Sequence, residues 1–305
     1  MKTRRIEKME DLADLLIARG LVVSSREDLL GVLKIVGYYR LTGFLYPYRA
    51  NDGTENFRPG TSLAEIWRLY TFDRRLRELA FQAISRIEVA LRAMIVRYQG
   101  ELCTDDPLLY RDHRWFPGHD VQMFSRMLSY ICRAVGQASN EASIKHFARD
   151  TDLPGVPVWA MMEVISLGTV TLYYEGLPFA VKKRICDEFS IHPNVFSGWL
   201  MAIKKVRNIC AHHTRLWNHK IVARLSLKMS HNSAAVDLYE CLKAQKSTPY
   251  TTVFSVLSIC AYMLRSIRPQ SRWTSRVKEL LADYPEVPLS AMGFPVDWQT
   301  FALWK

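Results

Sequence analysis

The chain has 305 residues and a formal net charge of +11, from 41 Lys and Arg against 30 Asp and Glu. Hydrophobic residues make up 49% of it and charged residues 23%, which is typical of a folded globular chain and excludes wholesale disorder. Its 14 Gly and 13 Pro exclude a collagen-like or low-complexity protein. At roughly 100–200 residues per domain, the length suits one large domain or two modest ones.

No clear export or membrane signal is present in the sequence. The strongest apolar run, 253–264, is shorter than the roughly 18 residues that a spanning helix needs. Acidic residues interrupt the start of the chain, whereas a secretory signal needs a basic N-terminal segment followed by an uninterrupted apolar segment. The 6 cysteines are dispersed without a CxxC pair, as expected for reduced thiols packed in a core. We therefore expect a cytoplasmic protein with no membrane partner.

The positive charge suits a polyanionic partner. Lys and Arg side chains release counterions from a phosphate backbone, which gives nucleic-acid affinity without reading the base sequence. Many soluble proteins are basic, however, so the charge alone leaves both interpretations open.

Apolar spacing predicts a mostly helical chain, because alternating strand patterns are scarce. Ser24 with Glu27, and Ser62 with Glu65, have the spacing of capping boxes at helix starts. The second would open an unusually long helix, which is a candidate for a break or a kink. The expected helices cover residues 9–19, 63–97, 121–135, 158–177, 179–189, 195–218 and 253–266.

We predict an all-α fold in three parts. Residues 1–60 form an N-terminal helical extension, 61–225 a helical core, and 226–305 a C-terminal helical region with an aromatic, proline-bearing arm. Glycine and proline limit regular structure in the aromatic and basic segment 36–49. That segment can stack on unpaired bases, or it can pack on the bundle as a lid.

The segment 195–218 carries the groups that could perform chemistry. On a wheel at about 100° per residue, His213 falls on an apolar seam with Trp199 and Val206, so we expect it to be buried. Adjacent His212 and His213 would point about 100° apart, which is poor geometry for sharing a metal ion, so we expect neither metal nor cofactor. The polar face carries Lys204, Lys205, Arg207, Asn208, His212 and Arg215.

These groups suit RNA cleavage without a metal. Imidazole is the side chain whose ordinary pKa favours proton transfer near neutrality, so His212 could take the proton of an attacking 2′-hydroxyl. Arg207 could hold the phosphate and offset developing charge, and Asn208 could fix the imidazole or bind a phosphate oxygen. Lys204, Lys205 and Arg215 would hold the strand. The plainer interpretation is a solvated face over a core, and the residue types alone do not exclude it.

Other charged residues are candidates for supporting roles. Glu88 and Arg92 are four apart and can form an intrahelical pair that either is purely structural or supports the motif. Asp73 and Arg77 have the same spacing. Glu163 interrupts an apolar helix, so we expect a buried carboxylate with a basic partner near the cleft.

The segment RNICAHHTRLWN, residues 207–218, resembles the Arg-x4–6-His motif of HEPN ribonucleases. A lone motif of this kind is weak evidence, but other blocks in the same chain resemble the Abi-like (AbiD/AbiF type) abortive-infection family. Together they span nearly the whole sequence. These blocks are GYYRLTGFLYPYR at 37–49, LYTFDRRLR at 69–77, IEVALR at 87–92, PVWAMMEVISLGTVTLY at 157–173 and MGFPVDWQTFALW at 292–304.

The resemblance implies a HEPN-like helical bundle that forms a homodimer. Arg207 and His212 of each copy would then line a shared cleft, with His213 in support. The motif admits either histidine, and His212 is preferred because the wheel buries His213. Active members cleave RNA without a metal, leave 2′,3′-cyclic phosphates, and act as toxins or phage-defence effectors. A protein or RNA antitoxin often restrains them.

One alternative within the family is a non-catalytic RNA-binding regulatory HEPN module. A DNA-binding regulator is a weaker interpretation, because the basic regions contain no convincing helix-turn-helix.

Overall fold

The computed structural model describes residues 8–103, 105–148, 155–221, 235–243 and 251–305. Within these ranges the fold is all-α, as predicted, and extended pairing is limited to isolated bridges. No helix in the same ranges is both long enough and apolar enough to cross a bilayer.

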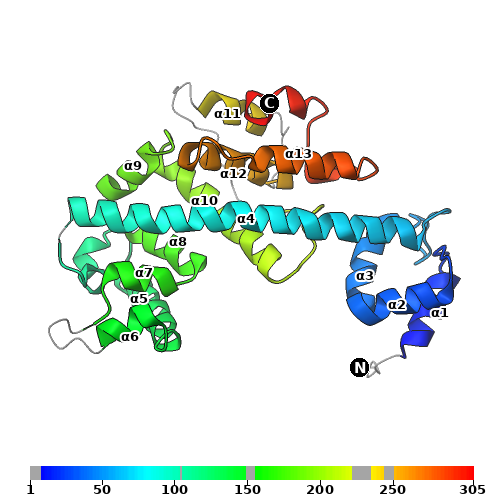
Figure 1. Cartoon of the computed structure of the whole chain (residues 1–305), viewed down its shortest axis with the longest axis horizontal. Coiled ribbons are helices and arrows are strands. Elements are labelled where there is room, and N and C mark those ends of the chain that lie inside the picture. The colour runs from blue at the N-terminus through cyan, green and yellow to red at the C-terminus, as the bar shows by residue number, and fades with distance from the viewer. Residues whose placement is uncertain (1–7, 104, 149–154, 222–234, 244–250) are drawn as a thin grey trace.

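The helix α4 (Leu63–Leu102) runs along the whole molecule (Figure 1). Ser62 caps its start by accepting a hydrogen bond from the backbone N–H of Glu65 at 3.2 Å, which confirms the predicted helix start and is one of the two bonds of a capping box. The helix has no break. Its buried residues recur from Leu63 to Gln99, and helices pack along both of its sides, so tertiary contacts support a length that propensity alone would not.

Three short helices gather under the N-terminal end of α4: α1 (Met9–Ala18), α2 (Arg26–Val36) and α3 (Tyr38–Leu45). Ser25, rather than Ser24, caps α2, so the predicted start was wrong by one residue. The helix α3 occupies a segment predicted to be irregular. Gly37, with φ of +81°, makes the sharp turn between α2 and α3.

A second group of helices lies under the other end of α4: α5 (Val121–Gln137), α6 (Ala142–Ala148), α7 (Val158–Val164) and α8 (Leu167–Gly176). The predicted helix 158–177 is in fact two. Ile165 is extended, and Ser166 caps α8 by accepting from the backbone N–H of Thr169. Arg92 stabilises this break by donating to the backbone carbonyls of Glu163 at 2.6 Å and Ile165 at 2.8 Å.

The remaining helices are α9 (Phe179–Asp187), α10 (Pro193–Ala211), α11 (Val236–Lys243), α12 (Val253–Ile267) and α13 (Trp273–Asp283). The helix α12 is buried along most of its length and packs against both α4 and α10. The helix α13 also lies against α4, on the side opposite the two groups described above (Figure 1). The C-terminal region therefore shares its core with the central helix.

The C-terminal arm is ordered, as its aromatic composition predicts. Trp304 is buried against Phe254 and Phe294, and its indole N–H donates to the Ser258 hydroxyl at 3.1 Å.

We expect Trp304→Ala to lower the free energy of unfolding by about 3–5 kcal/mol, because it empties a closely packed site. Urea denaturation measures this. Val296→Ala, on the exposed surface of the same arm, is the matched control. Equal losses in the two variants would contradict this packing.

The cysteines differ sharply in exposure. All are free thiols, and burial raises the pKa of the Cys186 and Cys210 thiols to about 12. Cys132 is exposed on α5, contrary to the prediction that all these thiols are packed.

A thiol reagent should therefore modify Cys132 first in the native protein, as a fast phase of labelling. Cys132→Ser should remove that fast phase. Mass spectrometry of timed samples locates the label, and early modification of Cys186 would be inconsistent with the fold.

Candidate functional site

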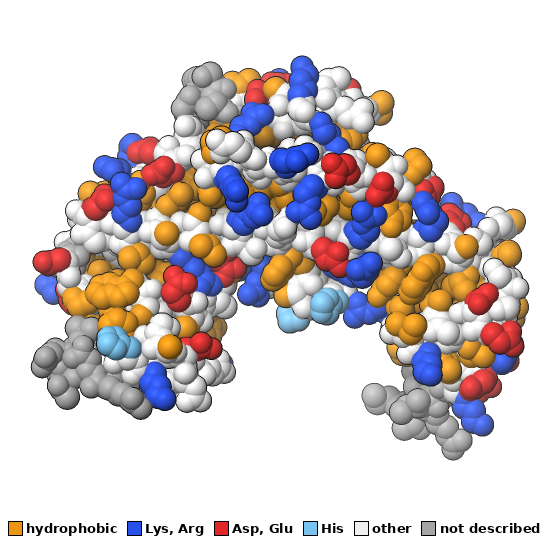
Figure 2. Space-filling model, in the orientation of Figure 1, with side chains coloured by type: hydrophobic (Ala, Val, Ile, Leu, Met, Phe, Trp, Pro, Cys, Tyr) orange, Lys and Arg blue, Asp and Glu red, His pale blue; other side chains and the backbone are white. Residues whose placement is uncertain are grey.

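The two groups of short helices project from the same side of α4 and leave a hollow between them (Figures 1 and 2). The segment that follows α10 emerges in the middle of this hollow, below α4. Figure 2 shows histidine side chains at the surface there. His212 and His213 are both exposed, so the hollow is the side of the molecule on which the histidines of the motif meet solvent.

The motif helix ends earlier than the sequence predicts. The helix α10 stops at Ala211, His212 is its C-cap, and His213 adopts a left-handed conformation with φ of +54°. The backbone N–H of Thr214 closes the turn by donating to the Ile209 carbonyl at 2.9 Å. The prediction that His213 is buried was therefore wrong, because a wheel does not apply beyond Ala211. The reason for preferring His212 over His213 falls with it.

Arg207 lies on α10, about one and a half turns before the histidines that follow the helix. Its side chain is half-buried, and its guanidinium donates a long hydrogen bond of 3.4 Å to the Asn208 amide oxygen. Its Nε is buried and has no hydrogen-bond partner among the described residues. Asn208 is exposed, and its backbone carbonyl accepts from the His212 N–H at 2.9 Å. Among the described residues, the guanidinium of Arg207 thus makes one long hydrogen bond to a protein group.

A buried carboxylate anchors the segment after α10. Asp73 of α4 is completely inaccessible, and its Oδ1 accepts from the backbone N–H groups of Leu216 at 2.8 Å and Trp217 at 2.7 Å. Its Oδ2 accepts from Arg77 at 2.6 Å. Burial raises the pKa of Asp73, while Arg77 and the two backbone donors oppose that rise. The predicted intrahelical pair therefore also tethers a loop distant in sequence.

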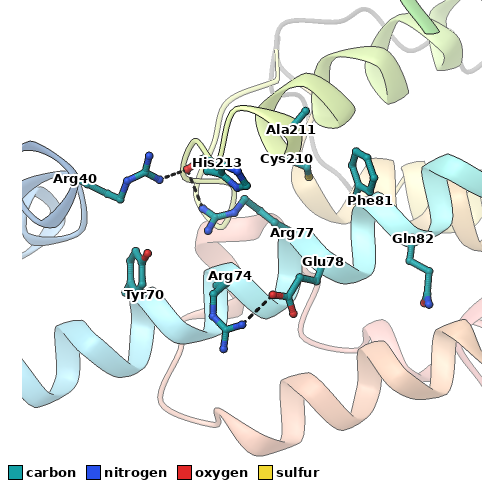
Figure 3. A pocket seen from close by; sticks show the side chains of 10 residues that line it. All are labelled: Arg40, Tyr70, Arg74, Arg77, Glu78, Phe81, Gln82, Cys210, Ala211 and His213. Carbon is teal, nitrogen blue, oxygen red and sulfur yellow. Dashed lines mark hydrogen bonds and ion pairs between the residues drawn. The ribbon is translucent and has the colours of Figure 1, made fainter. Parts of the chain in front are cut away.

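The backbone carbonyl of His213 is held from two sides. Arg77 donates to it at 3.2 Å and to the Thr214 carbonyl at the same distance, and Arg40 of α3 donates to it as well (Figure 3). We call residues 212–217 the histidine loop. Because side chains of both α3 and α4 donate hydrogen bonds to this loop, its position is fixed before any substrate binds. Sequence reasoning paired Asp73 with Arg77 but missed this role.

The cationic residues predicted to hold RNA have different surroundings. Arg215 is half-buried and donates to the Gly43 carbonyl in α3, and this burial lowers its pKa. Lys205 is exposed and Lys204 is half-buried, both on α10. Arg215 thus already contacts the protein backbone, whereas the side chain of Lys205 is exposed to solvent and available to a nucleic-acid strand.

A pocket of about 810 Å³ opens beside the histidine loop, between α3 and α4 (Figure 3). Neither Arg207 nor His212 lines it. The pocket adjoins the predicted motif on the α3 side and was not anticipated from sequence. Its walls include Arg40, Tyr70, Arg74, Arg77, Phe81 and His213.

The predicted supporting residues lie along α4 and at the end of α7. Glu88 and Arg92 form the expected ion pair, and Arg92 also caps the break after α7. The side chain of Glu163 is exposed, so the predicted buried carboxylate was wrong. Glu163 lies four residues after the exposed Trp159, so both residues are on the solvent-facing side of α7. None of the three lines the pocket beside the histidine loop.

The described residues contain no group of three or more His, Cys, Asp or Glu side chains arranged to hold a metal ion.

Comparison with family models matches residues 31–218 to the Abi-like protein family, more than half of the chain. The protein belongs to the Abi-like family. Membership indicates a role in abortive infection. This Abi-like match ends one residue after the histidine loop and leaves the block at 292–304 outside it. Comparisons with curated proteins and with solved structures found no match.

Proposed function

We propose that this Abi-like protein is a metal-independent endoribonuclease of the HEPN type that acts in abortive infection as a toxin or phage-defence effector. The observation that carries the proposal is the exposure of His212 on a hollowed face, five residues after Arg207, whose N–H groups make one long hydrogen bond among the described residues. The tethering of the histidine loop by Asp73 supports it, since a preorganised loop positions groups before reaction.

The proposed reaction is an internal transesterification. The imidazole of His212 removes the proton of a ribose 2′-hydroxyl, the 2′-oxygen forms a bond to the adjacent phosphorus, and the bond from phosphorus to the 5′-oxygen breaks. A second imidazolium, from a paired copy of the chain, donates a proton to the leaving 5′-oxygen. Arg207 offsets the charge that develops on the phosphate, with Asn208 beside it. Lys204, Lys205 and part of the Arg215 surface hold the flanking strand.

A shared site requires a homodimer. Arg207 and His212 of two copies would face each other across the hollow, and each copy would supply one of the two imidazoles. Light scattering should therefore report twice the mass of one chain. A protein or RNA antitoxin would restrain the enzyme by covering the same face.

The test is an incubation of the purified protein with mixed RNA in excess chelator. We expect fragments that end in 2′,3′-cyclic phosphate at one side of the cut and 5′-hydroxyl at the other. Salt-sensitive RNA binding without fragments would instead favour the non-catalytic RNA-binding module. Absence of both binding and cleavage would contradict either form of the proposal.

A further inference from the structure

The pocket between α3 and α4 has one aromatic ring that no other ring covers. Phe81 is 42% exposed, and it makes no ring contact with another aromatic side chain among the described residues. Tyr70, on the same helix, is instead stacked on Trp67 with ring centroids 5.2 Å apart. Single exposed apolar side chains are common on protein surfaces. What distinguishes Phe81 is its place in a pocket that contains guanidinium groups and adjoins the histidine loop (Figure 3).

The ring of Phe81 lies close to the histidine loop and to the end of the motif helix. Arg77 is four residues before Phe81 on α4, a distance of about 6 Å along the helix axis. Arg77 donates to the His213 carbonyl at 3.2 Å, so the ring is about one helical turn from a residue in contact with the histidine loop. Cys210 and Ala211, at the end of the motif helix, line the same pocket. A ligand that stacks on Phe81 would therefore lie next to the motif.

The charges around the ring favour a group attached to a phosphate. Arg40 is exposed, and of its five N–H donors the one bond to the His213 carbonyl leaves others for a ligand. Arg74 pairs with Glu78 at 2.9 Å, but both side chains are more than half exposed, and such surface pairs are weak enough to exchange for a phosphate. An aromatic face flanked by guanidinium groups is the arrangement that binds single-stranded nucleic acid.

We propose that this pocket is a subsite for an unpaired nucleobase of the RNA strand next to the scissile phosphate, with Phe81 as the stacking platform and with Arg40 and Arg74 on the neighbouring phosphates. The proposal rests on the proposed ribonuclease function and adds to it a requirement for single-stranded RNA. A base within an RNA duplex cannot enter the pocket, because both of its faces are already stacked on neighbouring bases. The enzyme should therefore cut loops and unpaired segments and spare duplexes.

The test measures binding of a short fluorescent RNA with 2′-O-methyl sugars, in which the 2′-oxygen cannot attack. We expect Phe81→Ala to weaken binding about 5- to 150-fold, the effect of losing one stacked base. Phe81→Trp should retain binding, since it keeps an aromatic face. Phe179→Ala, an exposed phenylalanine on α9 outside the pocket, is the matched control and should bind as the wild type does.

A second arm identifies the base. An abasic site is moved along the RNA one position at a time, and one position should weaken wild-type binding by the same factor as Phe81→Ala. At that position the two changes should be non-additive, because each removes one side of the same contact. Additive losses at every position, or unchanged binding by Phe81→Ala while the wild type still cleaves RNA, would overturn the subsite and leave the ribonuclease standing. A wild type that neither binds nor cleaves RNA would overturn both.

Discussion

His212→Ala should reduce RNA cleavage by about 100- to 10,000-fold, the range expected when a general base is lost. The substitution removes an exposed imidazole, and the backbone N–H of His212 keeps its bond to Asn208. The fold and the thermal unfolding transition should therefore stay unchanged. Single-turnover cleavage in chelator measures the effect on the chemical step. His146→Ala, which removes an exposed imidazole from α6, is the matched control and should cleave normally.

The structure makes a parallel experiment on His213 necessary, since that side chain is also exposed. Asparagine tolerates the left-handed backbone at this position, so His213→Asn removes the imidazole without adding strain. We expect a smaller loss than in His212→Ala, because we assign His213 a supporting role. A large loss in His213→Asn together with normal cleavage by His212→Ala would exchange the roles of the two histidines.

Asp73→Ala should lower the free energy of unfolding by about 3–5 kcal/mol, because it leaves Arg77 buried without its carboxylate. It also removes the acceptor for the backbone N–H groups of Leu216 and Trp217. The histidine loop should consequently lose its fixed position, and cleavage should fall even at temperatures where the variant remains folded. Denaturation in urea gives the stability, and hydrogen exchange at residues 216 and 217 reports on the loop.

The matched control is Asp283→Ala. Asp283 forms an ion pair of the same chemistry with Arg75 at 3.0 Å, but on the surface. Exposed pairs of this kind contribute about 0–1 kcal/mol, so the control should remain close to the wild type. Similar losses in the two variants would show that Asp73 does not anchor the loop.

Helix starts governed by neighbouring residues were predictable from sequence. The start of α4 follows from Ser62 and the backbone three residues later, an interaction that any chain with that spacing can make. The end of α10 was not predictable in this way. No glycine or proline follows Ala211, and the groups that hold the chain out of the helix are Asp73 and Arg77, which are more than a hundred residues away.

The candidate site also has parts that neighbouring residues determine and parts that distant contacts determine. The residue types of the motif, Arg207 with His212, are visible in the sequence, and the structure leaves His212 exposed. The burial of His213 was wrong because it depended on a helix that ends two residues earlier. The exposure of Glu163 was missed because the packing of α7 against α4 and α5 decides which of its faces is buried, and a helical wheel does not include that packing.

Replacement of one ribose by 2′-deoxyribose at a mapped cleavage site tests the central claim most directly. If the adjacent 2′-oxygen is the nucleophile, cleavage in chelator should stop at that position and continue at the other sites of the same strand. Cleavage that persists at the deoxyribose position would contradict the account, because the attacking oxygen would then come from elsewhere.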